Sequence, residues 1–175
     1  MMQTMHVSPQ AQLEDFYESI ARDCETSIIH MLGEAGCGKS SSLRSIIQYV
    51  REKHPDIVWK IFDVSQSHYH QSPLPHRQLV TLDKVMKQRV SNLDNCVYEL
   101  GSMSKQQRRM FIGEIMKSDY EKRYKAKLEG RLGEYPLMMY VVEECDVIFG
   151  SYSMRINDAY TPVFQQFVSV GRNYL

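Results

Sequence analysis

The stretch that most constrains the fold is residues 33–40, which read Gly-Glu-Ala-Gly-Cys-Gly-Lys-Ser. Its glycines let the backbone curl, so that successive N–H groups can converge on a phosphate group. The Lys39 ammonium can then reach the outer phosphates of a nucleotide, and the Ser40 hydroxyl can ligate Mg²⁺. The residues that we expect to contact a nucleotide are Gly33, Glu34, Ala35, Gly36, Cys37, Gly38, Lys39, Ser40 and Ser41.

The flanks of this loop have the pattern of a strand before it and a helix after it. Residues 26–32 form a β-branched, mostly apolar run, as expected for a buried strand. Residues 41–53 have apolar side chains at helical spacing, and His54-Pro55 ends the pattern. The positive end of that helix would face the bound anion. The alternative is a glycine-rich turn with an incidental lysine, but the order of strand, loop and helix favours nucleotide binding.

A group of acids follows a second apolar run. Residues 137–142 predict a buried central strand, which is followed by Glu143-Glu144-Cys145-Asp146. The carboxyl ends of parallel strands bind ligands, and phosphoryl transfer needs acids near the metal and the attacking water. We assign Glu143, with Ser40, to Mg²⁺, and Glu144 to orienting or deprotonating water. Asp146 is a reserve candidate for either role, and Lys39 joins Glu144 as a catalytic residue. The alternative is that these acids cap the next element.

Two further groups of polar residues leave alternatives open. Asp63 ends the apolar strand predicted over residues 57–64, and it either lines the nucleotide site or begins the next turn. His68, His70 and His76 lie in a loop predicted over residues 65–77. A metal site there is conceivable, but no acidic or cysteine spacing supports it, which favours a solvated loop.

The remaining elements alternate between helix and strand. Helices are expected at residues 9–22, 79–90, 104–129 and 159–170, and another strand at residues 95–100. The end of the third of these helices, residues 121–131, mixes both charge signs and is expected to be solvated. This alternation predicts an α/β domain with a mostly parallel central sheet. We expect one domain over residues 1–175, with a lead-in helix in residues 1–25 and a nucleotide-binding core in residues 26–175.

Length, net charge and cysteine content limit the kinds of protein that this chain can be. Its 175 residues suit one domain, and a formal net charge of zero gives no global basic field for nucleic acid. The four cysteines, Cys24, Cys37, Cys96 and Cys145, have no metal-ligand spacing and are expected to be free thiols. No run is long and apolar enough to span a membrane. We therefore expect a soluble, cytoplasmic protein.

In four places the chain resembles a family of P-loop ATPases. They are the phosphate loop at residues 33–40, the strand ending in Asp63, the acidic strand end at residues 141–144, and the Gly171-Arg172 segment. Together they resemble the FtsK–HerA class, which includes conjugative and viral genome-packaging ATPases. The resemblance implies a three-layer, RecA-like fold that uses ATP and Mg²⁺. It also implies a homo-oligomer, a hexameric ring, that moves double-stranded DNA in the cytoplasm, or in the host cytoplasm if the protein is viral.

The chain departs from that class in two respects. The class usually has Asp-Glu where this chain has Glu143-Glu144, and the chain stops at Leu175, before a further strand that the class carries. We therefore expect a domain truncated at its C-terminus. The resemblance also implies an arginine from a neighbouring subunit, for which Arg172, Arg108 and Arg109 are candidates. Ordinary surface arginines are the alternative.

Three functions are compatible with these patterns. The leading hypothesis is an ATPase that drives DNA translocation or packaging. The second is a nucleotide-binding switch or assembly module with little turnover. The third is a small-molecule kinase, in which residues 121–131 would form a lid over the phosphates.

Overall fold

A computed structural model describes residues 14–18, 37–64, 76–78, 95–146 and 158–169. Residues 14–18 are helical, as expected for part of the lead-in helix. The strand predicted at residues 26–32 and the helix predicted at residues 79–90 lie outside the described residues.

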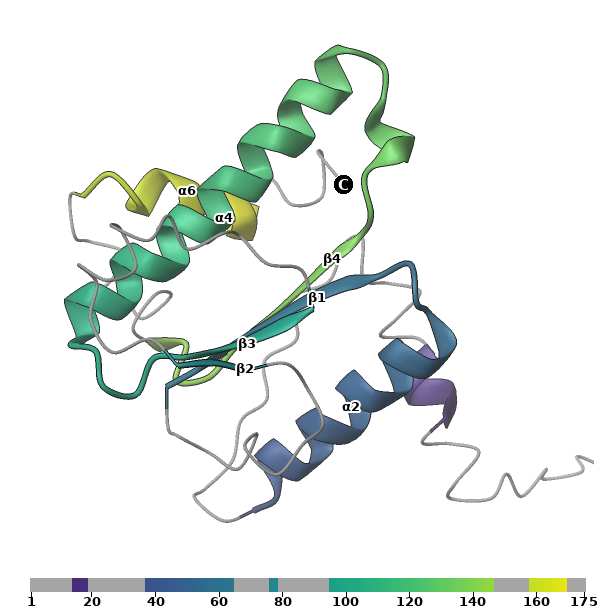
Figure 1. Ribbon diagram of the computed structural model, residues 1–175, viewed down its shortest axis with the longest axis vertical. Helices are drawn as coiled ribbons and strands as arrows, with labels where there is room; N and C mark the ends of the chain where they lie inside the picture. The colour runs from purple at the N-terminus through teal and green to yellow at the C-terminus, as the bar shows by residue number, and fades with distance from the viewer. Residues whose placement is uncertain (1–13, 19–36, 65–75, 79–94, 147–157, 170–175) are drawn as a thin grey trace, which may run out of the picture.

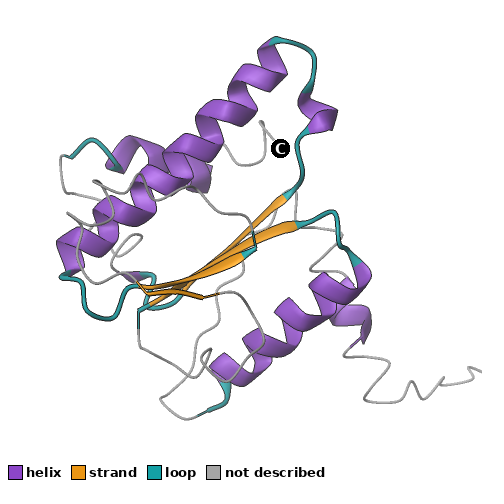
Figure 2. Ribbon diagram, viewed as in Figure 1, coloured by secondary structure: helices purple, strands orange, loops and turns teal. Residues whose placement is uncertain are grey.

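The described residues form an α/β fold in which helices cover both faces of one sheet (Figures 1 and 2). The sheet contains β1 (Val58–Asp63), β2 (His76–Gln78), β3 (Cys96–Glu99) and β4 (Met138–Val142). The helices are α2 (Lys39–Lys53), α4 (Lys105–Leu128) and α6 (Thr161–Ser169), with the 3-10 turn η3 (Leu132–Glu134). The predicted α/β class with a parallel sheet is confirmed.

Strand order in the sheet is β2-β3-β1-β4, and each described pair is parallel. Asp63 at the end of β1 is in register with Glu99 at the end of β3. Phe62 is in register with Val142, the last residue of β4. The carboxyl ends of three neighbouring strands therefore meet at one edge of the sheet.

The face that α2 covers is built by the odd-numbered residues of β1. Trp59 and Ile61 pack with Ile47 of α2 in one buried cluster, which also contains Val97 and Val141. Near the other end of the helix, Val50 packs against Ile57, which precedes β1. Hence α2 runs antiparallel to the strands, and its first turn points toward their carboxyl edge.

The opposite face of the sheet packs against α4 and α6. Phe62 stacks between Tyr98 and Tyr140, with ring centroids 5.5 and 6.5 Å away. Phe111 of α4 meets the rings of Phe62 and Tyr98 edge-on, and Phe164 of α6 belongs to the same buried cluster. Two apolar layers thus enclose the sheet.

The start of α4 is fixed by a capping box. The Ser104 hydroxyl accepts the Gln107 N–H, and the Gln107 side chain accepts the Ser104 N–H. At about 1.5 Å per residue, the 24 residues of α4 extend about 36 Å from the carboxyl edge. Figure 1 shows the second half of α4 passing beyond the sheet.

Three predictions about elements need correction. Helix α2 begins at Lys39 rather than at residue 41. The loop predicted over residues 65–77 gives way to strand β2 at His76, because that segment pairs with β3. Strand β4 is predicted to be buried, but Val141 is its one buried residue; its predicted central position is not tested, because the strand predicted at residues 26–32 lies outside the described residues.

Candidate functional site

The first turn of α2 offers backbone N–H groups to an anion. Gly38 precedes it with φ of 92°, a left-handed conformation that favours glycine. Among the described residues no side chain caps this helix start, and its first turn contains no acid. Since the first N–H groups of a helix have no partner within the helix and carry a partial positive charge, this end of α2 suits a phosphate.

The described part of the predicted phosphate loop lies at this helix start. Lys39 and Ser40 are half-buried, whereas Cys37, Gly38 and Ser41 are exposed. The Lys39 ammonium lies 3.8 Å from the Cys37 sulfur. The other predicted contacts, Gly33, Glu34, Ala35 and Gly36, lie outside the described residues.

Three acids occupy the carboxyl edge of the sheet. Side chains alternate between the faces of a strand, so Asp63 and Glu99 lie on the α2 face with Ile61 and Val97. Both are buried. The N–H of Glu143 donates to the Phe62 carbonyl at 3.2 Å, which continues the ladder by one residue and brings Glu143 beside Asp63. This arrangement gives the α2 face of the edge a row of carboxylates.

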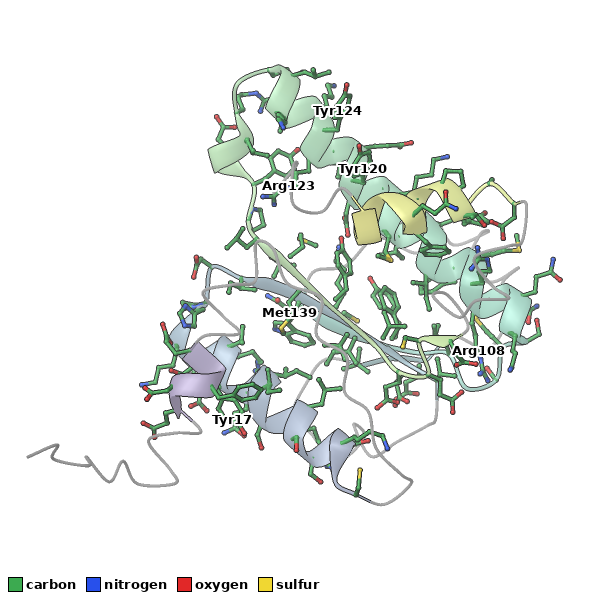
Figure 3. The ribbon with its side chains drawn as sticks, turned by 180° about the vertical axis from the view of Figure 1, so that it is seen from behind. Tyr17, Arg108, Tyr120, Arg123, Tyr124 and Met139 are labelled. Carbon is green, nitrogen blue, oxygen red and sulfur yellow. The ribbon has the colours of Figure 1, made fainter. Side chains whose placement is uncertain are left out.

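Glu144 lies in the turn after β4 and has a left-handed backbone, with φ of 49°. Its side chain is 55% exposed, and a carboxylate oxygen lies 3.9 Å from the Arg108 guanidinium. Figure 3 labels Arg108 at this end of the sheet. Asp146 follows with helical backbone and is exposed. The three predicted acids thus differ: Glu143 extends the sheet ladder, while Glu144 and Asp146 are presented to solvent.

The arginine candidates for a neighbouring site fall into different environments. The Arg109 guanidinium is buried, donates to Asp158 at 2.8 Å and to Thr161 at 2.7 Å, and covers the Phe164 ring. It is therefore a structural residue of its own chain. Arg108 donates to the carbonyls of Leu100 and Gly101, which fixes the turn before α4. Arg172 lies outside the described residues.

Burial alone would raise the pKa of Asp158, but hydrogen bonds reverse this effect. The side chain of Arg109 and the backbone and hydroxyl of Thr161 all donate to its carboxylate. The Tyr160 N–H donates to it as well. Together they lower the pKa of Asp158 from 3.8 to about 2. This carboxylate is a structural anchor between α4 and α6.

The residues at the edge suit a hard cation shared with a phosphate. Ser40 and Glu143 supply oxygen donors, which Mg²⁺ prefers. Within the described segments, no three His, Cys, Asp or Glu side chains come close enough to hold a metal by themselves. A magnesium ion here would depend on phosphate oxygens and water for its remaining ligands, as is usual for this ion.

Sequence reasoning did not single out Glu99. The signal was present, because a glutamate two residues after Val97 must share its face in a strand. The lid prediction for residues 121–131 finds no support in the fold, since residues 121–128 belong to the far half of α4. Figure 3 labels Tyr120, Arg123 and Tyr124 there, distant from Arg108 at the other end of α4.

Comparisons with protein-family models, curated proteins and solved structures found no match to this chain. Across the described helices, none combines the length and apolar character needed to cross a bilayer. The predicted free thiols Cys37, Cys96 and Cys145 are unbonded to one another, and Cys24 lies outside the described residues.

Proposed function

We propose that this protein is a Mg²⁺-dependent ATPase of the P-loop type that acts on double-stranded DNA as a ring. The observation that carries the proposal is the direction of α2, whose first turn points toward the sheet edge that carries the acids. Helix α2 starts at Lys39, behind left-handed Gly38, and at the edge that it points to, Asp63 ends β1 and Glu143 follows β4. A triphosphate and its cation need this pairing of positive helix start and oxygen donors.

Each residue has a distinct role in this proposal. Lys39 and the first N–H groups of α2 bind and orient the phosphates, while Ser40 and Glu143 hold the cation. Bound Mg²⁺ supplies charge neutralisation for phosphoryl transfer. Glu144 accepts a proton from water or orients it, and Asp146 is the reserve for that role. The DNA substrate and the ring are drawn from the resemblance to the FtsK–HerA class.

Lys39→Ala tests the phosphate site. Loss of the ammonium should abolish ATP binding or turnover, because no other described cation lies in the first turn of α2. Lys53→Ala removes an exposed lysine from the other end of the same helix and serves as the control. Binding of a labelled ATP analogue and phosphate release are measured for both. Unchanged ATP affinity and an unchanged rate of phosphate release in Lys39→Ala would contradict the assignment of the phosphate site.

Glu144→Gln separates binding from hydrolysis. The amide keeps the shape of the side chain but cannot accept the proton, so ATP should bind while turnover falls by about 10²-fold or more. If this variant hydrolyses ATP normally, Asp146→Asn is the next test of the base.

A nucleotide switch with slow turnover is the second candidate function. It is favoured by the position of Glu144. The carboxylate of this proposed catalytic base is exposed and lies near Arg108, which would make it less effective in activating water. Phosphate release with and without double-stranded DNA, together with a mass measurement of the assembly, distinguishes the two. DNA-stimulated turnover in a ring supports the motor. Nucleotide-dependent assembly without turnover supports the switch.

A further inference from the structure

A cavity lies at the edge of the sheet opposite the carboxyl edge. It has a volume of about 250 Å³ and is lined by Arg51, Pro55, Ile57, Trp59 and Asn95. Residue 57 precedes β1 and residue 95 precedes β3, so the cavity opens at the amino ends of the strands. Its size is just below the roughly 300–1,000 Å³ of common small-molecule pockets.

The polar groups of this cavity are donors. The Arg51 side chain lies over the Trp59 ring, with the guanidinium carbon 5.7 Å from the ring centroid. This cation–π contact holds the planar guanidinium in place and leaves its N–H groups for a ligand. Asn95 uses its Oδ1 to accept the Trp59 backbone N–H at 3.0 Å. The amide NH₂ of Asn95 is therefore the half of that side chain left to donate.

The rest of the lining is apolar. Ile57 and Trp59 are 3% exposed and form a firm floor, while Pro55 is exposed at the rim. A matching ligand needs coplanar acceptor oxygens to bind Arg51 and a small apolar group to contact Ile57 and Trp59. A carboxylate meets the first requirement, because its two oxygens fit the guanidinium fork.

The end of α2 does not oppose an anion here. The partial negative charge of a helix C-terminus would repel a carboxylate, but the last turn of α2 contains Arg51 and Lys53. The nearby carbonyl of His54 already accepts the Ile57 N–H at 3.0 Å. Glu52 accepts a hydrogen bond from Gln48, one turn back along the helix.

We infer that this cavity is a binding site for a carboxylate attached to a small branched apolar group, such as a short-chain acid or the C-terminal residue of a peptide. Arg51 binds the carboxylate, the Asn95 amide donates a second hydrogen bond, and Ile57 and Trp59 contact the apolar group. The inference is independent of the nucleotide site.

Trp59 is the single tryptophan of the chain, so its fluorescence reports on this cavity directly. The 175-residue chain without nucleotide is titrated with 3-methylbutanoate, with 3-methylbutanamide as the uncharged control and inorganic phosphate as the control anion. A saturable change with 3-methylbutanoate is expected, with little or none from the two controls. N-acetyl-glycyl-leucine, with a free or an amidated carboxyl, decides whether the source is a free acid or a chain end. Tighter binding of the free-carboxyl peptide than of 3-methylbutanoate favours the chain end.

Two variants test the donors. Arg51→Met keeps the length of the side chain and should weaken binding about tenfold or more. Asn95→Asp keeps the acceptor for Trp59 and tolerates the left-handed φ of 54°, but it replaces the donor by a charge that repels the ligand. Lys122→Met removes an exposed positive charge from the far half of α4, away from the cavity, and should bind normally. An equal response to phosphate or to the amide, or normal binding by Arg51→Met and Asn95→Asp, would overturn the site.

Discussion

At the scale of single residues, the buried charges of this fold are held by partners far away in the chain. Arg109 pairs with Asp158, 49 residues later, and Lys60 pairs with Asp119, 59 residues later. Neither lysine nor arginine could be left in an apolar interior without such an acid. The contribution of each ion pair to the free energy of unfolding can therefore be tested by replacing one of its two residues.

Asp158→Asn should destabilise the protein by about 2–3 kcal/mol at neutral pH. The Arg109 side chain is 4% exposed and would lose its counter-charge. Breaking a fully buried ion pair costs roughly 3–5 kcal/mol. The loss here is smaller because Asp158 is 26% exposed to water. Urea unfolding at pH 7 measures this loss. Asp56→Asn, at an exposed position, is the control and should change little.

The same carboxylate predicts an acid dependence of stability. Its pKa is depressed to about 2 in the folded protein from 3.8, so its contribution is complete above pH about 4 and is lost as pH falls toward 2. Unfolding measured between pH 5 and pH 2.5 should show a shallower loss in Asp158→Asn than in the unmodified chain. Parallel curves for the two proteins would contradict the prediction.

At the scale of elements, an ion pair between Lys60 and Asp119 links β1 to α4, which packs on one face of the sheet. The Lys60 ammonium is fully buried, lies 2.6 Å from Asp119, and shares that carboxylate with the Tyr140 hydroxyl of β4 at 2.8 Å. Lys60→Met should cost about 3–5 kcal/mol, because Asp119 stays behind as a poorly compensated buried charge. Adding Asp119→Leu should recover most of the loss. Urea unfolding of both single variants and the double variant measures the coupling, and additive effects would contradict it.

The contact between α4 and α6 depends on a glycine. A Cβ on Gly113 would lie 2.5–2.9 Å from three atoms of Tyr160. In Gly113→Ala, this overlap costs about 1–3 kcal/mol and outweighs the gain of up to about 1 kcal/mol in helix propensity. We expect a net loss of about 1–2 kcal/mol in thermal unfolding. Gly133→Ala, where a Cβ meets nothing within 4 Å, is the control.

Elements were predictable where the pattern is local. The apolar spacing after the phosphate motif predicts helix α2, although the helix begins two residues earlier than predicted, and Ser104 with Gln107 marks the start of α4. The half-buried state of β4 was not predictable, because an apolar run does not tell how much of each side chain its neighbours cover. The left-handed turn at Glu144 and the pairing of Lys60 with Asp119 depend on tertiary contacts that one sequence does not encode by spacing.

At the scale of the whole molecule, the two ends of the sheet are chemically different. The carboxyl edge carries Asp63, Glu99 and Glu143, and the first turn of α2 points toward it. The amino edge carries the Arg51–Trp59 cavity beside the end of the same helix. The proposed nucleotide, bound between the start of α2 and the carboxyl edge, would contact both the helix layer and the sheet layer.

A ligand that joins two layers should stabilise the folded chain as a whole. At a concentration one hundred times its Kd, MgATP is expected to contribute about 2.7 kcal/mol, which raises the melting temperature of a domain of this size by about 5–10 °C. Lys39→Ala should lose this shift, whereas Lys53→Ala, at the other end of α2, should keep it. Thermal unfolding with MgATP, with ATP and a chelator, and with inorganic phosphate separates the contributions of cation and phosphate. An equal shift in Lys39→Ala would mean that the nucleotide binds away from the start of α2, and that the acids at the carboxyl edge have another role.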